Sequence, residues 1–258
     1  MKITILGCGW SSGVPIPGCD CAVCTSDDPR NRRRRTSILV EQGGACVLVD
    51  SSPDLRAQLL DAGVTRLDGV IYTHAHADHV HGIDDLRPIN YAMRSAIDIY
   101  GDDATLSSVE TRFSYAFRMI DPERPWISPT LLPHRFTGPF EVAGLKVRPF
   151  LQEHGHMPTQ GLRFDDAAAY STDAHSLDEA AFEILAGVGV WIVDCIGIRP
   201  HGTHSHLEQT LGWIERVKPR LAVLTHMSHG VDYESFLAQC PTGVVPAYDG
   251  MVINTDEF

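Results

Sequence analysis

Four side chains that can bind a metal ion follow directly on a short apolar run in the first third of the chain. The run, residues 70–73, is rich in β-branched and aromatic residues and predicts a buried strand. After it come His74, His76, Asp78 and His79. In an extended segment His74 and His76 point to the same side, because side chains alternate along a strand. If a helix begins near Asp78, that residue and His79 lie on its first turn and can face a second ion.

Further candidate ligands follow later predicted strands. They are His154 after the strand 145–151, Asp173 after the strand 167–172, and His226 after the strand 221–224. Imidazole and carboxylate groups accept zinc, manganese or iron. His156 is the alternative to His154, which lies nearer the end of its strand. A solvated, histidine-rich turn is the alternative for residues 74–79, but it does not explain why candidate ligands also follow later strands.

These residues divide into two ligand sets that share one carboxylate. The first ion takes His74, His76 and His154, the second takes Asp78, His79 and His226, and Asp173 bridges them. Two ions about 3.5–4 Å apart can hold a bridging hydroxide and clamp the oxygens of an in-line phosphoryl displacement. The pattern therefore predicts a hydrolase with two divalent ions, zinc or manganese, in its active site.

Three cysteines lie close together in a polar loop near the start of the chain. They are Cys19, Cys21 and Cys24. Thiolates at this spacing suit tetrahedral zinc, but a closed structural site needs a fourth ligand from elsewhere in the chain. The 7 cysteines of the chain fit a reducing compartment with a metal site better than a disulfide framework. A redox-active cysteine loop is the alternative.

The succession of predicted strands and helices indicates α/β layers, in one domain that covers residues 1–258. A hairpin is expected at 42–45, where two glycines separate two apolar runs. We expect helices over 53–62 and 104–117, and a proline-rich loop over 120–139. The hydrophobic content of 43% is ordinary for a globular protein.

The formal net charge of −12 argues against a general nucleic-acid-binding surface. One local exception is the arginine cluster, which consists of Arg30, Arg32, Arg33, Arg34 and Arg35. It is either a solvated patch or a contact for an anion, because guanidinium groups match phosphate oxygens. No apolar run approaches the length of a membrane helix, and the glycine-rich start does not fit a signal peptide. We therefore expect a cytoplasmic protein without a membrane partner.

The segment His74-Ala-His76-Ala-Asp78-His79 matches the HxHxDH signature of the metallo-β-lactamase superfamily, whose members are mostly binuclear metallohydrolases. This resemblance implies an αββα sandwich, in which helices flank two mixed β-sheets. The cysteine loop together with Thr225-His226-Met-Ser-His229 resembles the phosphoribosyl cyclic phosphodiesterase (PhnP-like) subfamily of the carbon–phosphorus lyase pathway. The similarity runs along essentially the whole chain.

The subfamily resemblance implies roles for further residues. His229 would complete a structural zinc site with the three cysteines. His204, within Thr203-His204-Ser205, matches a catalytic histidine of the family, so we expect His204 and the ligand Asp78 to be catalytic. The implied substrate is a small phosphorylated compound such as phosphoribosyl 1,2-cyclic phosphate, and a homodimer is expected from the relatives. His206 replaces an acidic residue of the family, and substrate contacts outside the ligands do not align.

Three other functions are compatible with parts of this pattern. A tRNA 3′-processing endonuclease shares the metal motif, but it normally brings a long basic arm that we do not find in the sequence. A carrier-like relative from quinone-cofactor biosynthesis shares the cysteine loop, but such relatives degrade the HxHxDH ligands, which are complete here. A carboxyl-ester or lactone hydrolase is the remaining enzymatic alternative.

Overall fold

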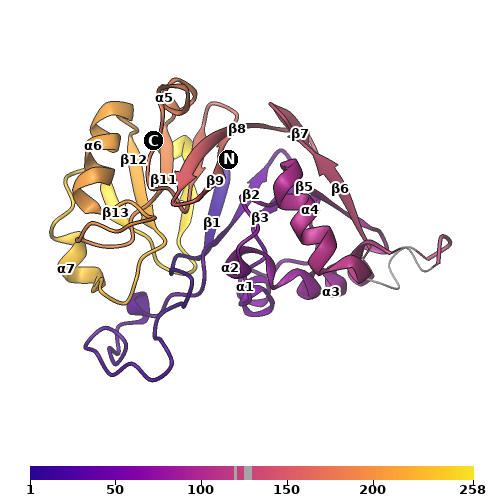
Figure 1. The fold of residues 1–258 in the computed structure, drawn as a ribbon, viewed down its shortest axis with the longest axis horizontal. Helices are drawn as coiled ribbons and strands as arrows, with labels where there is room; N and C mark the ends of the chain where they lie inside the picture. Colours follow the sequence, from indigo (N-terminus) through magenta and orange to yellow (C-terminus); the bar gives the residue numbers. More distant parts are fainter. Residues whose placement is uncertain (119–120, 125–129) are drawn as a thin grey trace.

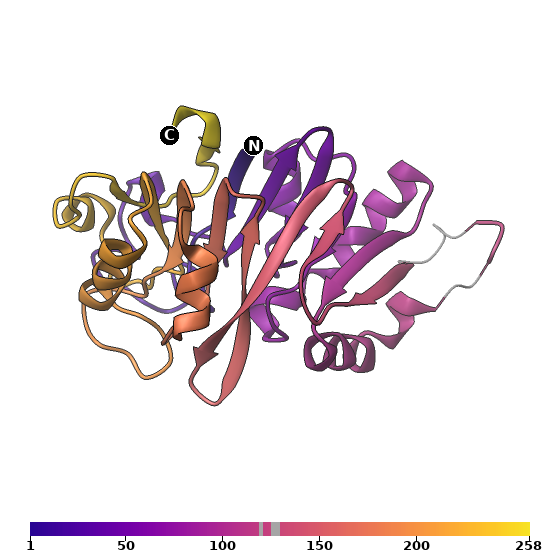
Figure 2. The same ribbon diagram turned by 90° about the horizontal axis from the view of Figure 1, so that it is seen from above.

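Two seven-stranded sheets lie against each other at the centre of the molecule, and helices flank them (Figure 1, Figure 2). The computed structural model describes residues 1–118, 121–124 and 130–258. The first sheet has the strand order β14-β1-β2-β3-β4-β5-β6, and the second has the order β13-β12-β11-β10-β9-β8-β7. Both sheets contain parallel and antiparallel pairs. The expected αββα sandwich of mixed sheets is confirmed.

The strands divide between the two sheets as follows. The first sheet contains β1 (Lys2–Gly7), β2 (Ser37–Gln42), β3 (Ala45–Val49), β4 (Gly69–Ile71), β5 (Ile97–Gly101), β6 (Leu131–Arg135) and β14 (Val252–Asn254). The second contains β7 (Phe140–Val142), β8 (Leu145–His154), β9 (Met157–Phe164), β10 (Ala168–Ser171), β11 (Val190–Asp194), β12 (Leu221–Thr225) and β13 (Val244–Pro246). The α-helices are α1 (Leu55–Asp61), α2 (Ala77–Val80), α3 (Arg87–Met93), α4 (Asp103–Arg112), α5 (Glu179–Leu185), α6 (Leu207–Val217) and α7 (Tyr233–Leu237).

Alternating side chains of the first sheet supply two hydrophobic cores. In β2, Ile38 and Val40 join the core between the sheets, whereas Leu39 joins the core beneath the helices that follow in the chain. The same alternation places Val47 of β3 between the sheets and Leu48 outside them. Because side chains of a strand point to opposite faces in turn, a sheet buried on both sides must be apolar at consecutive positions. This accounts for the continuous apolar runs in the sequence.

The predicted hairpin between the second and third strands is confirmed. Gln42 of β2 pairs with Ala45 of β3, so that only Gly43 and Gly44 form the turn. Both glycines have positive φ angles, 58° and 95°. A two-residue hairpin turn of this kind requires positive φ at both positions, which glycine adopts without steric cost. The turn fixes the register in which β3 leads toward the centre of the sheet.

Parallel strands bring their carboxyl ends to one end of the sandwich. In the first sheet β3, β4 and β5 are parallel neighbours, and in the second β10, β11 and β12 are. Loops that leave the carboxyl ends of neighbouring parallel strands meet at the same edge of the sheet. The segments that follow β4, β10 and β12 carry most of the candidate ligands. The fold therefore supplies the convergence that the sequence pattern requires.

The strand predicted over 145–151 is longer than expected, because β8 continues to His154 and pairs with β9 along its length. His154 is therefore the last residue of a strand and does not follow one. Burial alternates along β8, but Gln152 and His154 occupy the inward positions at its end. Polar residues at buried positions break the apolar pattern. The prediction from the sequence therefore ended the strand too early and did not include the hairpin between β8 and β9.

Three other predicted elements differ from the structure. The helix expected over 53–62 begins at Leu55, one residue after its N-cap, and the helix expected over 104–117 ends at Arg112 before a 3₁₀ turn. The loop expected over 120–139 contains the edge strand β6, where Pro133 is tolerated, while residues 119–120 and 125–129 of this region lie outside the described residues. Within the described residues, no helix combines the length and apolarity that a membrane crossing needs.

Candidate metal centre

The candidate ligands come from both sheets and meet at one end of the sandwich. His74 and His76 lie in the short loop after β4, and Asp78 and His79 lie in α2, which begins close to the position expected from the sequence. The other candidates are His154 at the end of β8, Asp173 after β10 and His226 after β12. All except His76 are buried. Segments up to about 150 residues apart in the chain thus contribute to one polar centre.

Two groups of potential ligand atoms share Asp173. In each group the nitrogen and oxygen atoms all lie within 4.8 Å of one another. The first group consists of His74, His76, His154 and Asp173, and the second of Asp78, His79, Asp173 and His226. The structure therefore brings together the residues of both ligand sets expected from the sequence, in the same division.

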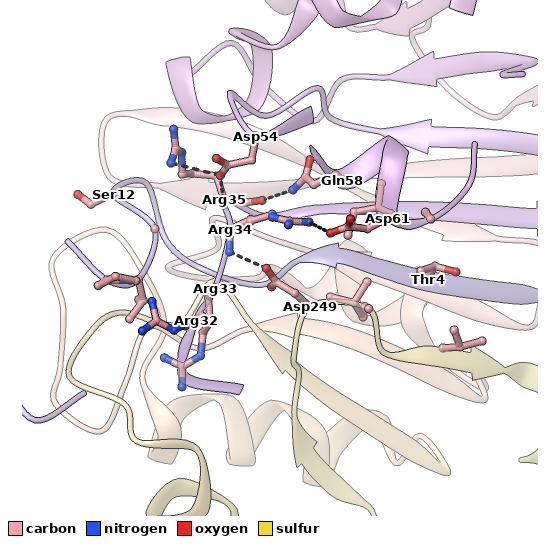
Figure 3. A pocket seen from close by; sticks show the side chains of 18 of the residues that line it. Thr4, Ser12, Arg32, Arg33, Arg34, Arg35, Asp54, Gln58, Asp61 and Asp249 are labelled. Carbon is pink, nitrogen blue, oxygen red and sulfur yellow. Dashed lines mark hydrogen bonds and ion pairs between the residues drawn. The ribbon is translucent and has the colours of Figure 1, made fainter. Parts of the chain in front are cut away.

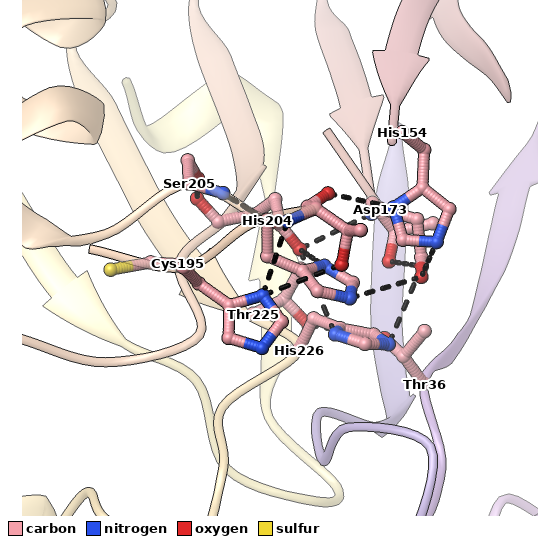
Figure 4. A network of polar contacts seen from close by, with 12 residues as sticks. Thr36, His154, Asp173, Cys195, His204, Ser205, Thr225 and His226 are labelled. Atoms are coloured by element: carbon pink, nitrogen blue, oxygen red, sulfur yellow. Dashed lines mark hydrogen bonds and ion pairs between the residues drawn. The ribbon is translucent and has the colours of Figure 1, made fainter. Parts of the chain in front are cut away.

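The two oxygens of Asp173 face different groups of histidines (Figure 4). Oδ1 lies 4.0 Å from Nε2 of His74 and 3.7 Å from Nε2 of His154. Oδ2 lies 3.1 Å from Nε2 of His79 and 3.4 Å from Nε2 of His226. A carboxylate that presents one oxygen to each of two ligand groups has the geometry of a bridge between two ions.

Several of the buried histidine nitrogens at this centre lack a hydrogen bond. Nε2 of His74 and Nε2 of His226 make none, although carboxylate oxygens lie within 4.0 Å of both. A buried polar atom without a partner costs about 1–3 kcal/mol, so such groups are rare in folded proteins. Nitrogens and oxygens that converge without hydrogen bonds fit cations placed between them. The donor set, imidazole with carboxylate, suits zinc or manganese.

Neighbouring polar groups fix the orientation of the ligand rings. Asp50 is completely buried, and its Oδ2 lies 2.7 Å from Nδ1 of His79. Asp50 also accepts hydrogen bonds from the backbone N–H and the hydroxyl of Thr73. Nδ1 of His154 lies 2.8 Å from the carbonyl oxygen of Thr203. A partner on Nδ1 leaves Nε2 directed at the centre, which is the usual way in which a protein orients metal-binding histidines.

The backbone is strained at the same place. Asp50, Asp173 and His226 adopt positive φ angles of 62°, 53° and 59°, in the left-handed region. For residues other than glycine this conformation costs about 1–3 kcal/mol and is concentrated at functional sites. Two of these three residues are candidate ligands, and the third holds a ligand. The strain directs their side chains out of the strand ends and into the centre.

The pKa of a histidine in such a centre depends on two opposing effects, because burial lowers it and nearby carboxylates raise it. Burial lowers the pKa of His74 well below its usual value, and it also lowers the pKa of His154. His79 is equally buried, but Asp173, Asp78 and Asp50 surround it and together raise its pKa well above the usual value. Neutral His74 and His154 are in the protonation state in which imidazole binds a cation.

His204 lies beside the ligand groups and pairs with an aspartate. Its ring stacks on that of His226 with centroids 4.6 Å apart, and its Nε2 lies 3.9 Å from Oδ1 of Asp173. Its Nδ1 lies 3.4 Å from Oδ1 of Asp194, at the end of β11. Burial lowers the pKa of His204, but Asp194, Asp173 and Asp78 together outweigh burial, and the pKa is raised. His204 can therefore hold a proton close to the centre.

Asp194 is a site residue to which the sequence analysis assigned no role. It is completely buried and accepts hydrogen bonds from the backbone N–H groups of Asp173, at 3.2 Å, and Ser205, at 3.0 Å. Together with His204 and His226 it forms a third group of potential ligand atoms within 4.8 Å. Its one signal in the sequence is its position at the end of an apolar strand, which Asp50 shares.

The three loop cysteines also lie together. The sulfurs of Cys19, Cys21 and Cys24 are within 4.8 Å of one another. The imidazole of His229 does not belong to this group, but the carbonyl oxygen of His229 lies 4.0 Å from Sγ of Cys21. The ring of His229 packs against Trp10, and its Nδ1 is buried without a hydrogen bond. The structure thus places the segment after β12 against the cysteine loop.

Other residues considered in the sequence analysis lie outside the ligand groups. His156 is exposed in the turn between β8 and β9, so His154, not His156, joins the centre. Within the described residues, neither ligand group includes His206, which is the N-cap of α6 and makes no capping bond with its side chain. Cys46 and Cys240 lie outside the cysteine group.

Comparisons with known proteins agree with this geometry. The beta-lactamase superfamily domain matches residues 46–227. A crystal structure of a diphosphatase from the PhnP family superposes with a TM-score of 0.90 at 36% identity, over 98% of this chain and 96% of that chain. Zn²⁺-bound PqqB from Methylobacterium extorquens superposes with a TM-score of 0.80 at 20% identity, over 98% of this chain and 100% of that chain, and this likeness concerns the fold alone.

Two curated relatives carry other names. An octanoyltransferase of Porphyromonas gingivalis is 35% identical over the whole chain, and the chain spans about half of that relative, 52% of its length. A ribonuclease Z of Bradyrhizobium is 38% identical over 31% of this chain and 28% of that protein. The match to the superfamily domain and the PhnP-family structure, each over most of the chain, determines the family. The chain belongs to the metallo-β-lactamase superfamily and, within it, to the PhnP family.

Proposed function

We propose that the protein is a two-metal phosphodiesterase that hydrolyses a small, cyclic phosphodiester such as phosphoribosyl 1,2-cyclic phosphate. The superfamily and the PhnP-family relative identify a metal-dependent hydrolase. The observation that carries the finer proposal is Asp173, whose two oxygens face two separate ligand groups. Two adjacent ions are the arrangement that phosphoryl transfer uses to stabilise the attacking and the leaving oxygen.

The chain's residues fit two ions. One set would be His74, His76 and His154, the other Asp78, His79 and His226, with Asp173 common to both. When bound, two divalent ions, zinc or manganese, supply Lewis-acid stabilisation of phosphoryl oxygens and lower the pKa of water. Asp50 and the carbonyl of Thr203 hold the rings of His79 and His154 in the orientation that binding requires.

We assign proton donation to the leaving oxygen to His204. Asp194 lies on the Nδ1 side of the ring, so Nε2 is the nitrogen directed toward Asp173 and the ligand groups. An alkoxide leaving group needs a proton as the phosphorus–oxygen bond breaks, and a positioned acid supplies it. The Asp194 carboxylate favours the charged imidazolium before transfer, and Ser205 and Asp173 hold that carboxylate in place through their backbone N–H groups.

The diphosphatase relative makes a phosphoanhydride the second candidate substrate. A phosphoanhydride shares the charged phosphoryl centre of a phosphodiester, but its leaving group is a phosphate that needs no proton. The match to the Bradyrhizobium ribonuclease Z covers only 31% of the chain, and the net charge of −12 opposes binding to a polyanion. These two observations favour a small substrate over tRNA.

A panel of substrates tests the proposal. Hydrolysis of bis-p-nitrophenyl phosphate, phosphoribosyl 1,2-cyclic phosphate, a dinucleoside diphosphate, a tRNA precursor and a lactone is measured side by side with the metal-loaded protein. We expect the highest kcat/KM on the cyclic phosphate. A higher kcat/KM on the dinucleoside diphosphate would mean that the protein is a diphosphatase and not a phosphodiesterase. Lactone hydrolysis without turnover of either phosphorus substrate would refute phosphoryl chemistry altogether.

We further propose that the cysteine loop holds a structural zinc ion. The three sulfurs lie within 4.8 Å of one another, as ligands of one ion must. His229 is the fourth ligand in this proposal, since its backbone already contacts Cys21 and its Nδ1 is buried without a partner. His229 lies three residues after the ligand His226, so zinc there would tie the amino-terminal loop to the active-site segment.

Replacing Cys21 by serine is expected to remove one zinc ion per chain and to lower the temperature of thermal unfolding. Turnover should fall only as far as His226 becomes less well held, because the cysteine loop contributes no atom to the other centre. Zinc content by elemental analysis is the measurement. Cys46→Ser is the matched control, because Cys46 lies in β3, away from the loop, and should keep all its zinc. Unchanged zinc in Cys21→Ser would rule out the structural site.

A further inference from the structure

We propose that an arginine-lined cavity beside α1 binds the phosphate group of a small organic phosphomonoester, at a site separate from the metal centre. The cavity has a volume of about 600 Å³, within the usual range for small-molecule sites. Its walls come from β1, the loop 12–15, residues 32–35 of the arginine cluster, α1 and the segment 249–252 (Figure 3). None of the candidate metal ligands lines it.

The charge of the cavity is opposite to that of the whole chain. The cationic residues in its lining are Lys2, Arg32, Arg33, Arg34 and Arg35, and the acidic ones are Asp54, Asp61 and Asp249. The cations therefore outnumber the acids here, although the chain has a net charge of −12. A concave surface of one sign concentrates ions of the other sign. The excess of cationic side chains in the lining favours an anion.

Arg34 is held by a partner that a ligand can displace. Its guanidinium lies 2.7 Å from Oδ2 of Asp61, and the side chains of the pair are 33% and 68% exposed. An ion pair so open to water contributes about 0–1 kcal/mol. A dianionic phosphate presents more charge and more acceptor oxygens than the single carboxylate of Asp61, so it can take the guanidinium from it.

Arg35 has a donor that the protein leaves unused. Its Nη1 lies 3.2 Å from Oδ2 of Asp54, but its Nε is buried and makes no hydrogen bond with any described residue. Because Nε is closed to solvent, the part of Arg35 that a ligand reaches is the end of the guanidinium, whose partner Asp54 is itself 23% exposed. Arg33, which also lines this wall, has a structural role. Its guanidinium is buried and donates to Asn31 and to the carbonyl oxygen of Val231. Arg33 thus fixes the wall that presents its neighbours.

The rest of the lining fits an organic group and not a bare ion. Leu6, Val14, Pro15 and Val252 offer apolar surface next to the guanidinium groups, and the cavity is much larger than one phosphate requires. Asp249 opposes an anion less than its charge suggests, because its two oxygens accept hydrogen bonds from the backbone N–H groups of Cys8 and Arg34. A phosphomonoester with a ring system uses both parts of this lining.

Calorimetric titration of the metal-loaded protein with adenosine 5′-monophosphate tests the proposal. In the double variant Arg34→Gln, Arg35→Gln we expect the affinity of this site to fall at least tenfold. In Asp61→Asn we expect it to rise about threefold, because the carboxylate that competes for Arg34 loses its charge. Turnover should stay within twofold of the unmodified protein in every variant, since these residues contribute nothing to the metal centre.

Matched controls separate the cavity from general attraction. Arg56 is exposed on the same helix and does not line the cavity, so Arg56→Gln should bind as the unmodified protein does. The double variant keeps the backbone N–H groups that bind Asp249 and Asp54, so it should fold, and thermal unfolding verifies this. An equal loss in Arg56→Gln, no loss in the double variant, or equally tight binding of inorganic phosphate would each overturn the proposal. Any inhibition of turnover by the probe is measured separately and reports on the metal centre alone.

Discussion

The Asp78→Ala variant is expected to lose at least about 10³-fold of phosphodiesterase turnover and to remain folded. Asp78 lies 3.3 Å from Nε2 of His79 and 3.7 Å from Nε2 of His226, within the second ligand group. Without its carboxylate that group keeps two imidazoles and its share of Asp173, and the second ion is held weakly. Loss of one ion removes several kcal/mol of charge stabilisation in the transition state, and each 1.36 kcal/mol is tenfold in rate.

Two measurements on the variant and a matched control make this result specific. Bound metal should fall by one ion per chain, while the thermal unfolding transition stays cooperative. Asp84→Ala is the matched control, because Asp84 follows closely in the chain but is exposed and bonds the hydroxyl of Tyr115. The control should keep its metal and its turnover. Substantial turnover in Asp78→Ala with one ion missing would show that a single ion suffices.

The His204→Ala variant is expected to lose about 10²–10⁴-fold on a substrate with an alkoxide leaving group, which is the usual value of positioned proton transfer. On bis-p-nitrophenyl phosphate the loss should be much smaller, because p-nitrophenolate leaves without a proton. The two substrates are compared as kcat/KM at one pH. The difference between the two losses isolates the proton-transfer role from any effect on binding or on the metal ions.

His206→Ala is the matched control for this comparison. His206 lies two residues after His204 but belongs to neither ligand group, so its loss should leave both substrates unaffected. Equal losses on both substrates in His204→Ala would assign His204 to substrate binding. No loss on either would leave it a buried histidine beside the centre, without a part in the reaction.

The candidate ligands could be predicted because each is marked by a pattern in its own stretch of sequence. His74 and His76 follow an apolar strand at alternate positions. Asp173 and His226 are polar residues that each come just after the end of another apolar strand. Parallel strands place their carboxyl ends together, so several independent local patterns imply one site. The sandwich was likewise predictable, once the signature pointed to its superfamily, and the fold comparison confirms it.

Asp50 and Asp194 could not be assigned a role, because their partners are distant in the chain. Asp50 meets Thr73 and His79 only because β3 pairs with β4 in a register that sets Val49 beside Ile71. The register and the crossover between strands are tertiary properties. A single aspartate after an apolar run does not predict them. The same holds for the cavity beside α1, whose walls come from both ends of the chain.

His154 shows a different limit of prediction. The sequence identified it as a ligand candidate, but the strand that carries it was predicted to end at 151. Gln152 makes hydrogen bonds to Thr159 and to the carbonyl oxygen of Thr172, so it is buried at an inward position of β8. A polar residue satisfied by tertiary hydrogen bonds looks the same in sequence as one in a loop. Functional sites are where such departures from the apolar pattern concentrate.

The account is tested most directly by counting ions against turnover. Protein treated with a chelator is titrated with Mn²⁺ or Zn²⁺, while bound metal and hydrolysis of bis-p-nitrophenyl phosphate are measured on the same samples. We predict no turnover without added ion, and a maximum only when two ions per chain are bound beyond any zinc in the cysteine loop. Full turnover with a single ion, or with none, would contradict the two-metal phosphodiesterase.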